Sequence, residues 1–238
     1  MKKFFLLILL LLISCLPKNK QKLTNTDDSK PKFDCSKFNL KVGDILFQDS
    51  DCGPFCESIE KVTFGVNGAK FSHVGLVITD NANKLIVIEA VSKGVVKTSL
   101  DDFFNRSFDE KNRSKVVVGR IKNEYQELIP KAVNFTKSNL GLAYDEVFDI
   151  TNNKYYCSEL IYDSFKYANN NTPIFQLKPM TYKDPETNAT FRIWEDYFKK
   201  LNIEIPEGKL GLNPGGMSKS KFIEIVYFYG KPQGYVGK

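Results

Sequence analysis

Apolar residues recur along the chain in two patterns, which are short β-branched runs and longer stretches with a helical period. The short runs have the length and composition of strands. They cover Gly43 to Gln48, Phe71 to Thr79, Leu85 to Val91, Gly94 to Ser99, Lys115 to Ile121 and Phe222 to Tyr229. The turn-forming residues Asp80 to Asn83 join the second run to the third, which predicts a β-hairpin.

The helical patterns lie on either side of these runs. They cover Glu57 to Phe64, a turn at Leu100 to Asn105, Glu124 to Leu140, Cys157 to Ala168 and Phe191 to Leu201. Gly141 is a natural stop for the third of them. Strands clustered between flanking helices predict an α+β fold. The glycine-rich segment Lys209 to Lys219 predicts a flexible loop, either a lid or a linker.

The N-terminus has the pattern of a secretory signal. Two lysines precede an apolar run from Phe4 to Ile13, which is too short to span a bilayer as a helix. The run ends in Leu12-Ile13-Ser14-Cys15, which resembles the bacterial lipobox, in which the cysteine is acylated and becomes the new N-terminus. An ordinary signal peptide, with Cys15 incidental, is the alternative. We therefore expect a signal peptide over residues 1–14 and a lipid anchor at Cys15 that attaches the protein to a membrane.

The rest of the chain has the composition of one folded domain. Residues 15–37 are polar and rich in lysine and asparagine, which predicts a flexible tether, and the domain is expected over residues 38–238. Of all residues, 42% are hydrophobic and 26% charged, as in ordinary globular proteins. The net charge of +6 is dispersed along the chain, so no nucleic-acid partner is expected.

Four cysteines remain if Cys15 carries lipid. An envelope location permits disulfides, and one bridge is expected among Cys35, Cys52 and Cys56, although the sequence does not choose the pair. A metal site built from these three and His73 is the alternative. Zinc ligands usually come as two short pairs, and this set has only one, with an unusual spacing. We therefore expect no metal and no cofactor.

Cys157 and His73 are candidates for nucleophilic chemistry. A cysteine attacks a carbonyl as its thiolate, so it needs an activating neighbour. Cys157 opens a predicted helix, whose positive N-terminal end favours the thiolate. The imidazole can come only from His73, the single histidine in the chain. Each residue alone would more often be a buried structural side chain.

The predicted hairpin supplies a third candidate, Glu89. If the hairpin is symmetric about Asn81, residue 77 pairs with 85, 75 with 87, and His73 stands directly opposite Glu89. A carboxylate in an otherwise apolar strand needs a partner, and the imidazole is one. On the same face, Gly75 either leaves room for substrate or for the helix of Cys157, or is a simple packing glycine.

These residues resemble a known family. The segments Phe71 to Val77 (FSHVGLV), Ile88 to Ala90 (IEA) and Tyr156 to Ile161 (YCSELI) resemble the YiiX/YebB-like branch of the NlpC-type, papain-like cysteine hydrolases. The order histidine, acid, cysteine is that of the circularly permuted members, which include the lecithin:retinol acyltransferase-like proteins. The resemblance covers about Val42 to Tyr167 and begins with the characteristic Gly43 to Gln48. Beyond residue 170 no comparable match is visible, so an extra C-terminal segment is expected.

The resemblance implies a circularly permuted papain-like α+β fold, with an antiparallel sheet packed with helices. It implies Cys157 as nucleophile, His73 as general base and acid, and Glu89 as the residue that orients the imidazole. Gly141 to Asp145 resembles a Gly-x-x-Tyr segment, which makes Tyr144 a substrate-site or oxyanion residue, with aromatic packing as the alternative. Gln48 is a weaker candidate for the same place.

The expected activity is acyl transfer by an envelope-anchored cysteine peptidase or amidase. Cell-wall peptides are the first expected substrate, and lipid ester or amide deacylation or acyl transfer is the alternative. The expected location is the periplasmic face of the outer membrane in a bacterial cell envelope. A lipoprotein that uses the same cleft only to bind a lipid or peptide is the non-enzymatic alternative.

Overall fold

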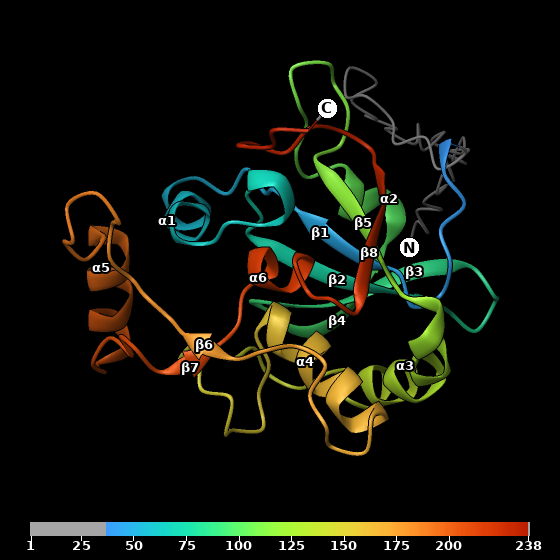
Figure 1. The fold of residues 1–238 in the computed structure, drawn as a ribbon. Helices are drawn as coiled ribbons and strands as arrows, with labels where there is room; N and C mark the ends of the chain where they lie inside the picture. The colour runs from blue at the N-terminus through green and yellow to red at the C-terminus, as the bar shows by residue number, and fades with distance from the viewer. Residues whose placement is uncertain (1–36, 238) are drawn as a thin grey trace, which may run out of the picture. The chain divides into compact units, whose positions relative to one another are not determined.

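The computed structural model describes residues 37–237 (Figure 1). The expected signal peptide, the tether up to residue 36, the anchor Cys15 and the candidate Cys35 lie outside these residues. Within the described part, no helix is long and apolar enough to cross a membrane.

A single antiparallel sheet carries the site. Over the described residues it has six strands in the order β4-β3-β2-β1-β5-β8. The strands are β1 (Ile45–Gln48), β2 (His73–Thr79), β3 (Leu85–Val91), β4 (Gly94–Ser99), β5 (Val116–Ile121) and β8 (Ile223–Phe228). All six expected strands form, although β8 comes from the far end of the chain and pairs with β5 at one edge of the sheet.

Each face of the sheet packs against a different group of helices. Val74, Leu76 and Ile88 point to one face, where they form the main core with α4 (Cys157–Ala168) and α3 (Ile129–Ser138). Val77 and Val87 point to the other face and pack against the short α2 (Leu100–Phe104). The sheet is therefore buried on both sides, which explains why its central strands are apolar at nearly every position.

Three further helices and a short second sheet complete the described chain. They are α1 (Pro54–Val62), α5 (Arg192–Leu201), α6 (Pro214–Ser218) and the two-stranded pair β6 (Lys178–Pro179) with β7 (Leu210–Gly211). In Figure 1, α1 and α5 lie at one end of the sheet, with α6 between α1 and α4.

The predicted helix from Glu124 to Leu140 is in fact two elements. Its first part is a 3₁₀ helix, η3 (Asn123–Leu128), and the α-helix begins only at Ile129, with Pro130 in its first turn. Proline lacks an amide hydrogen and suits the first turn of a helix rather than its interior. Pro130 therefore sets the boundary that the apolar period alone did not indicate.

The hairpin between β2 and β3 forms, but its register differs from the expected one by two residues. Val77 pairs with Val87 rather than with residue 85. The Asp80 carboxylate accepts hydrogen bonds from the amides of Ala82 and Lys84, and the chain turns over the five residues 80–84. A shift of two residues keeps every side chain on its face of the sheet. His73 and Glu89 thus still share a face, but they are diagonal neighbours rather than directly opposed.

Gly75 is a packing glycine. A β-carbon at this position would lie 2.5 Å from Val87 Cγ1 and 3.2 Å from Phe103. Both contacts lie on the α2 side of the sheet, whereas α4 packs on the other side. The expectation that Gly75 makes room for substrate or for the helix of Cys157 is therefore wrong.

The segment from Lys209 to Lys219 is ordered rather than a flexible loop. It contains β7 and α6, and Leu212, Pro214 and Met217 are buried. Ser218 Oγ accepts a hydrogen bond from the Val66 amide at 3.0 Å. The glycines allow close packing here, because a β-carbon at Gly215 would lie 3.1 Å from the backbone of Thr63.

Candidate functional site

Cys157 is the first residue of α4. Tyr156 precedes it with an extended backbone, and the carboxylate of Glu159 accepts a hydrogen bond from the Tyr156 amide at 3.2 Å. This bond caps the helix start. Burial raises the pKa of Glu159 to about 9, so its carboxyl group is uncharged at neutral pH and does not oppose a thiolate two residues away. Among the described residues, Cys157 is the free cysteine, and its side chain is 8% exposed.

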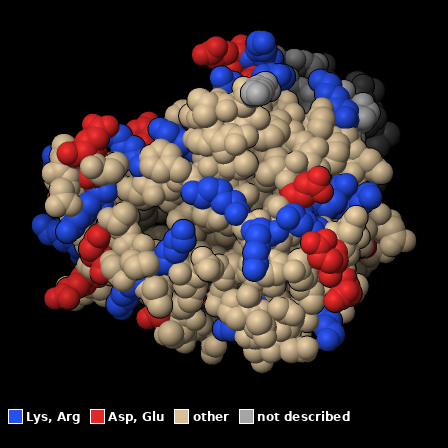
Figure 2. All heavy atoms as spheres, viewed as in Figure 1, with Lys and Arg blue, Asp and Glu red and all other residues tan. Residues whose placement is uncertain are grey.

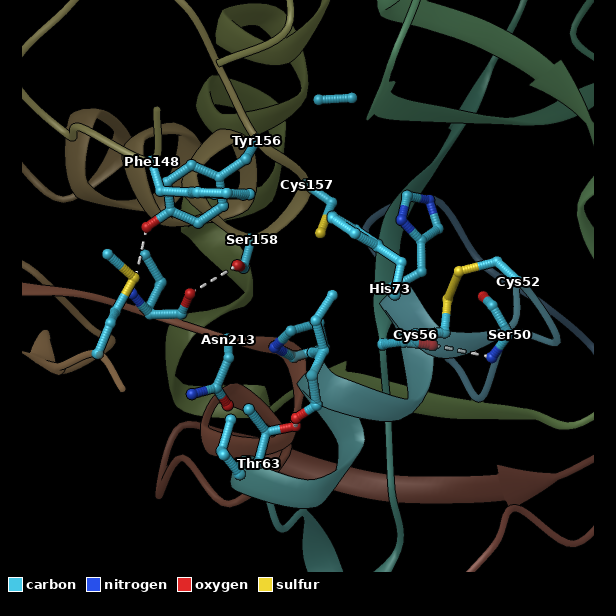
Figure 3. A pocket seen from close by; sticks show the side chains of 18 of the residues that line it. Ser50, Cys52, Cys56, Thr63, His73, Phe148, Tyr156, Cys157, Ser158 and Asn213 are labelled. Carbon is cyan, nitrogen blue, oxygen red and sulfur yellow. Dashed lines mark hydrogen bonds between the residues drawn. A yellow bond between two sulfur atoms is a disulfide. The ribbon is translucent and has the colours of Figure 1, made fainter. Parts of the chain in front are cut away.

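The C-terminal part of the chain holds this helix start in place. Ser158 Oγ donates a hydrogen bond to the Leu212 carbonyl at 3.0 Å, and the Leu212 amide donates to the Tyr156 hydroxyl at 3.2 Å (Figure 3). Residues on both sides of Cys157 are thereby tied to one segment. The sequence did not predict this role for residues beyond 170.

His73 lies between Cys157 and Glu89. Its Nε2 contacts Glu89 Oε2 at 2.5 Å, which leaves Nδ1 for Cys157. Figure 3 shows His73 and Cys157 at one end of the cavity. Burial opposes the charged ring, but hydrogen bonds to Cys157 and Glu89 outweigh it and raise the pKa of His73 to about 9. The geometry therefore favours an imidazolium next to the sulfur at neutral pH.

Glu89 has more partners than the sequence indicated. It is fully buried and accepts hydrogen bonds from Arg106 Nη1 at 2.7 Å and Arg106 Nη2 at 2.5 Å, and a further one from the Thr98 hydroxyl. Burial would raise the pKa of Glu89, but the bonds from Arg106 and His73 outweigh it and hold that pKa well below its ordinary value. A buried carboxylate in an apolar strand predicts a cation nearby. Nothing in the sequence pattern says that this cation is Arg106.

A cavity of about 660 Å³ opens next to Cys157 and His73. Its walls come from α1, from the segment around Phe148, from α5, from residues 179–182 at and after β6, and from residues 212–214, which follow β7 and reach the start of α6. They are mainly apolar and aromatic. The apolar lining residues include Phe55, Ile59, Phe148, Met180, Trp194, Tyr197 and Leu212. Figure 2 shows a hollow in the surface between α1, α5 and α6, while charges of both signs are scattered over the rest of this face.

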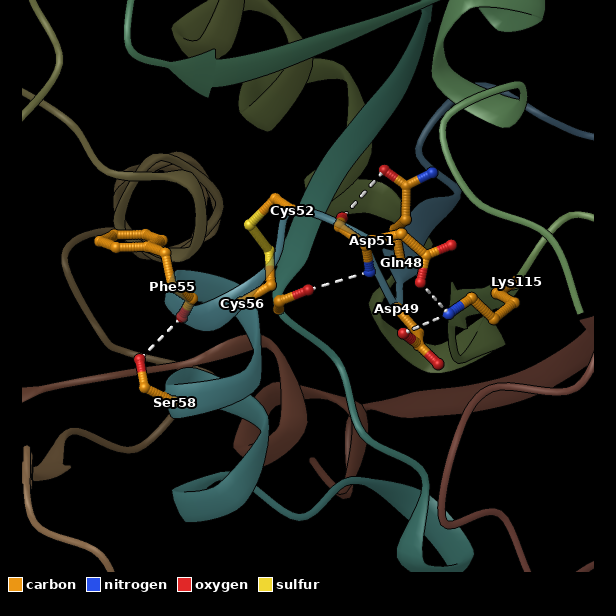
Figure 4. The surroundings of a disulfide bond; sticks show 10 residues. Gln48, Asp49, Asp51, Cys52, Phe55, Cys56, Ser58 and Lys115 are labelled. Carbon is orange, nitrogen blue, oxygen red and sulfur yellow. Dashed lines mark hydrogen bonds and ion pairs between the residues drawn. A yellow bond between two sulfur atoms is a disulfide. The ribbon is translucent and has the colours of Figure 1, made fainter. Parts of the chain in front are cut away.

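The structure separates the two substrate-site candidates. Tyr144 lines the cavity, whereas Gln48 is fully buried outside it. The Gln48 amide nitrogen donates to the Phe103 carbonyl at 2.7 Å, and its amide oxygen accepts a hydrogen bond from the Ser50 hydroxyl at 3.4 Å (Figure 4). Gln48 is therefore not placed to contact a substrate in the cavity. Burial is the main cause that raises the pKa of Tyr144 well above its ordinary value, and the electrostatic interaction with the neighbouring Cys157 adds to it. Its hydroxyl consequently stays protonated.

A disulfide between Cys52 and Cys56 forms part of the cavity wall (Figure 4). The disulfide spans the first turn of α1, just after the loop that holds Asp49 and Asp51. Lys115, which precedes β5, binds this loop through Asp49 at 2.8 Å and Asp51 at 2.6 Å. The pairing within the expected set of three is thus Cys52 with Cys56. Their sulfurs are bonded to each other, so they are not free to act as thiolate ligands in the alternative metal site.

The comparisons with known proteins agree with this arrangement. Residues 39–227 match the model of a family described as permuted papain-like amidase enzymes, YaeF/YiiX, C92 family. The chain belongs to this family. The match extends about 60 residues beyond the resemblance seen in the sequence, so β8, α5 and α6 are part of the family domain. The expected permuted papain-like α+β fold and the coarse expectation of a cysteine amidase are confirmed.

A solved structure supports the same fold. The metalloprotein yiiX from Escherichia coli O157:H7 superposes with a TM-score of 0.64 at 23% identity, over 81% of this chain and 99% of that one. A search of curated proteins finds no match. In residues 37–237 of this chain, no group of three or more histidine, cysteine or acidic side chains is arranged to hold a metal ion. The described residues therefore do not fit a metal site.

The single histidine allows a direct test of the pairing with Cys157 and Glu89. We expect the ring proton of His73, followed by NMR, to titrate near pH 9. The ring holds its proton below this value and loses it as the pH rises through it. The midpoint should fall in Cys157→Ala and in Glu89→Gln, because each removes a partner that favours the charged ring. Arg113→Gln, which changes an ion pair with Asp109 elsewhere, is the control. A wild-type midpoint at or below about 6.5, the value of an unperturbed histidine, would contradict the pairing.

Proposed function

We propose that the protein is a cysteine amidase that works by acyl transfer, with Cys157 as nucleophile, His73 as acid and base, and Glu89 as the residue that orients the imidazole. The observation that carries the proposal is the position of His73, one ring with the sulfur of Cys157 on one side and the Glu89 carboxylate on the other. An orienting acid, a base and a nucleophile in this relation are the working parts of acyl-transfer enzymes on unrelated folds.

The proposed reaction has two halves. The Cys157 thiolate attacks the substrate carbonyl carbon, and the His73 imidazolium gives its proton to the leaving nitrogen or oxygen as the bond to that atom breaks. A thioester to Cys157 remains, and His73 is now neutral. Its free ring nitrogen then takes a proton from water, which attacks the thioester and releases the acid. Cys157 leaves as the thiolate beside a recharged imidazolium.

The oxyanion of the first half needs hydrogen-bond donors beside Cys157. One is the backbone amide of Cys157 itself, since the first amides of a helix have no partner within it. The second is the Tyr144 hydroxyl, which lines the cavity and remains protonated. Donors of this kind act on the charge that develops as the carbonyl is attacked.

The cavity supports an apolar acyl group as the substrate part that it binds. Phe148, Trp194 and Tyr197 line it. Apart from His73 and Cys157, the acidic and basic side chains in its lining are Asp51, Arg106 and Glu146. Cell-wall peptides carry several charged groups, which would lose water in such a cavity without gaining partners. We therefore place an amide or ester of a fatty acyl chain first among the proposed substrates. A cell-wall peptide, the first expectation from the sequence, becomes second.

A lipid anchor at Cys15 would hold the enzyme next to substrates of this class. The lipobox motif supports the anchor. The apolar cavity is consistent with it, because a cavity that binds long acyl chains needs access to lipids, which are found at a membrane surface rather than in solution.

The proposed substrate class is tested with probes of increasing chain length. On p-nitrophenyl acetate, butyrate and octanoate, and on N-octanoyl p-nitroanilide, kcat/KM should rise with chain length by up to about fourfold per methylene, the value for full burial of a CH₂ group. Cys157→Ala should be inactive throughout. Trp194→Ala should flatten the dependence, and Tyr167→Ala, which changes an exposed ring outside the cavity, should not. Cleavage of muropeptides combined with no chain-length dependence would move the assignment to the cell wall.

The Tyr144 hydroxyl is tested by Tyr144→Phe. We expect kcat to fall by about 10²-fold, because one oxyanion donor is lost. The rate at which iodoacetamide alkylates the peptide containing Cys157 should stay the same, since the thiolate and His73 are intact. Tyr167→Phe removes a distant hydroxyl as the control. If kcat is unchanged in Tyr144→Phe, this tyrosine only packs.

The anchor is tested in cells by metabolic labelling with a radioactive fatty acid. The wild-type protein should carry the label and fractionate with membranes. Cys15→Ser should lose the label and keep its signal sequence, because the acylated residue is missing. Ser14→Ala, which leaves a small residue before the cysteine, is the matched control. Equal labelling of Cys15→Ser would show that the attachment is elsewhere.

A further inference from the structure

Arg106 is a charged residue at the site that the proposed chemistry does not use directly. It follows α2, its side chain is 32% exposed, and it lines the cavity. Its guanidinium lies over the Phe103 ring, 5.1 Å from the centroid, and its Nη1 and Nη2 atoms both donate to the Glu89 carboxylate. It is therefore held from two directions.

The Glu89 carboxylate is saturated by its donors. Oε2 accepts from His73 and Arg106, and Oε1 accepts from Arg106 and Thr98. A carboxylate has about four lone-pair sites, and all of them are occupied. The groups that face it are His73 from β2, the neutral Thr98 from β4, and Arg106 from the segment after α2, where Phe103 adds an apolar ring.

The two cationic side chains at Glu89, His73 and Arg106, differ in whether they keep their charge during one catalytic cycle. His73 is charged before the first half of the proposed reaction and neutral once it has protonated the leaving group. At that stage Arg106 is the remaining positive charge on a fully buried carboxylate. Without it, Glu89 would be left buried and unpaired, and such a group takes up a proton. A protonated Glu89 would compete as a donor and no longer hold the imidazole in one orientation.

We propose that Arg106 is a positioning residue that keeps Glu89 ionised while His73 is neutral, so that the imidazole remains oriented as the base for hydrolysis of the thioester. This inference rests on the proposed function and adds a requirement to its second half. Arg106 acts through Glu89 and His73 and does not touch the reacting atoms. Its loss should consequently slow hydrolysis of the thioester more than its formation.

The experiment separates the two halves with p-nitrophenyl butyrate. The burst of nitrophenol reports thioester formation, and the steady rate that follows reports hydrolysis. In Arg106→Gln the burst should persist and the steady rate should fall by about tenfold or more, part of what general base catalysis contributes. Arg106→Lys keeps the charge and should recover much of the rate. Arg113→Gln removes an arginine outside the cavity and should resemble the wild type.

The pH profile provides a readout that a purely structural arginine would not change. Without Arg106, Glu89 keeps its proton to a higher pH, so the acid limb of the steady rate should move to higher pH. In Arg106→Lys it should stay near the wild-type position. In a Glu89→Gln background, Arg106→Gln should add little further loss, because its partner charge is already gone.

The outcomes distinguish this inference from the proposed function. If Cys157→Ala still gives a burst, the proposed function fails. If Cys157→Ala abolishes the burst, but Arg106→Gln keeps the wild-type ratio of burst to steady rate and the wild-type pH profile, Arg106 only stabilises the fold. If Arg106→Gln loses its near-ultraviolet circular dichroism, that variant is misfolded, and the inference is then tested by Arg106→Lys alone. A lysine keeps the positive charge but cannot make the paired bonds of arginine. If Arg106→Lys has wild-type kinetics, the charge is the essential feature. If Arg106→Lys loses as much rate as Glu89→Gln, the proposed role of the charge is wrong.

Discussion

A carboxylate buried within an apolar sheet is the constraint on which the site depends. Glu89 cannot be charged in this position unless donors surround it, and these donors come from β2, β4 and the segment after α2. The same bonds that stabilise the charge therefore fix the relative positions of three elements. His73 is one of these donors, so its ring orientation follows from the need to satisfy Glu89. The sheet thus supplies a histidine with one ring nitrogen bound to Glu89 and the other available to Cys157.

The other half of the site is built by a different part of the chain. Cys157 comes from a helix that packs on the opposite face of the sheet from α2, and the segment around Leu212 ties down the residues beside it. The aromatic wall of the cavity is built mainly from residues after position 140. The β2–β3 hairpin thus provides the proposed acid–base pair, and the C-terminal half provides the proposed nucleophile and most of the cavity wall. The two parts meet at the start of β2, where the proposed chemistry occurs.

Much of this was predictable because it depends on local patterns. Strand and helix positions followed from apolar periods. The candidates Cys157, His73 and Glu89 followed from their combination: a cysteine at the start of a predicted helix, a histidine and an acid on one face of a hairpin, and the family resemblance of the segments that carry them. The hairpin register was predicted two residues away from the observed one, because the turn is longer than the symmetric guess. The predicted contact between His73 and Glu89 nevertheless forms, because side chains alternate along a strand with a period of two. Pro130, by contrast, lies in the first turn of α3, so the α-helix begins later than the apolar pattern predicted.

What escaped prediction depends on contacts between distant segments. Arg106 is 17 residues from Glu89, and nothing in its surroundings marks it among the other cations. Gln48 was a plausible amide donor by type, but the fold uses its amide to bind Phe103. The glycines of residues 209–219 indicated flexibility, whereas Gly215 permits close packing against the backbone of Thr63 at the end of α1. In each case nothing in the sequence indicated the distant partner that the fold supplies.

The dependence of Cys157 on Leu212 has a consequence for how the site is completed. The three candidate catalytic residues all lie before position 158, whereas the segment that secures the helix start lies 54 residues beyond Ser158 and also lines the cavity. β8, which completes the sheet, follows later still. A chain in which this segment has not packed therefore carries the thiol, the imidazole and the carboxylate without the enclosure that surrounds them in the folded protein. The site is complete only when residues far apart in the chain have met.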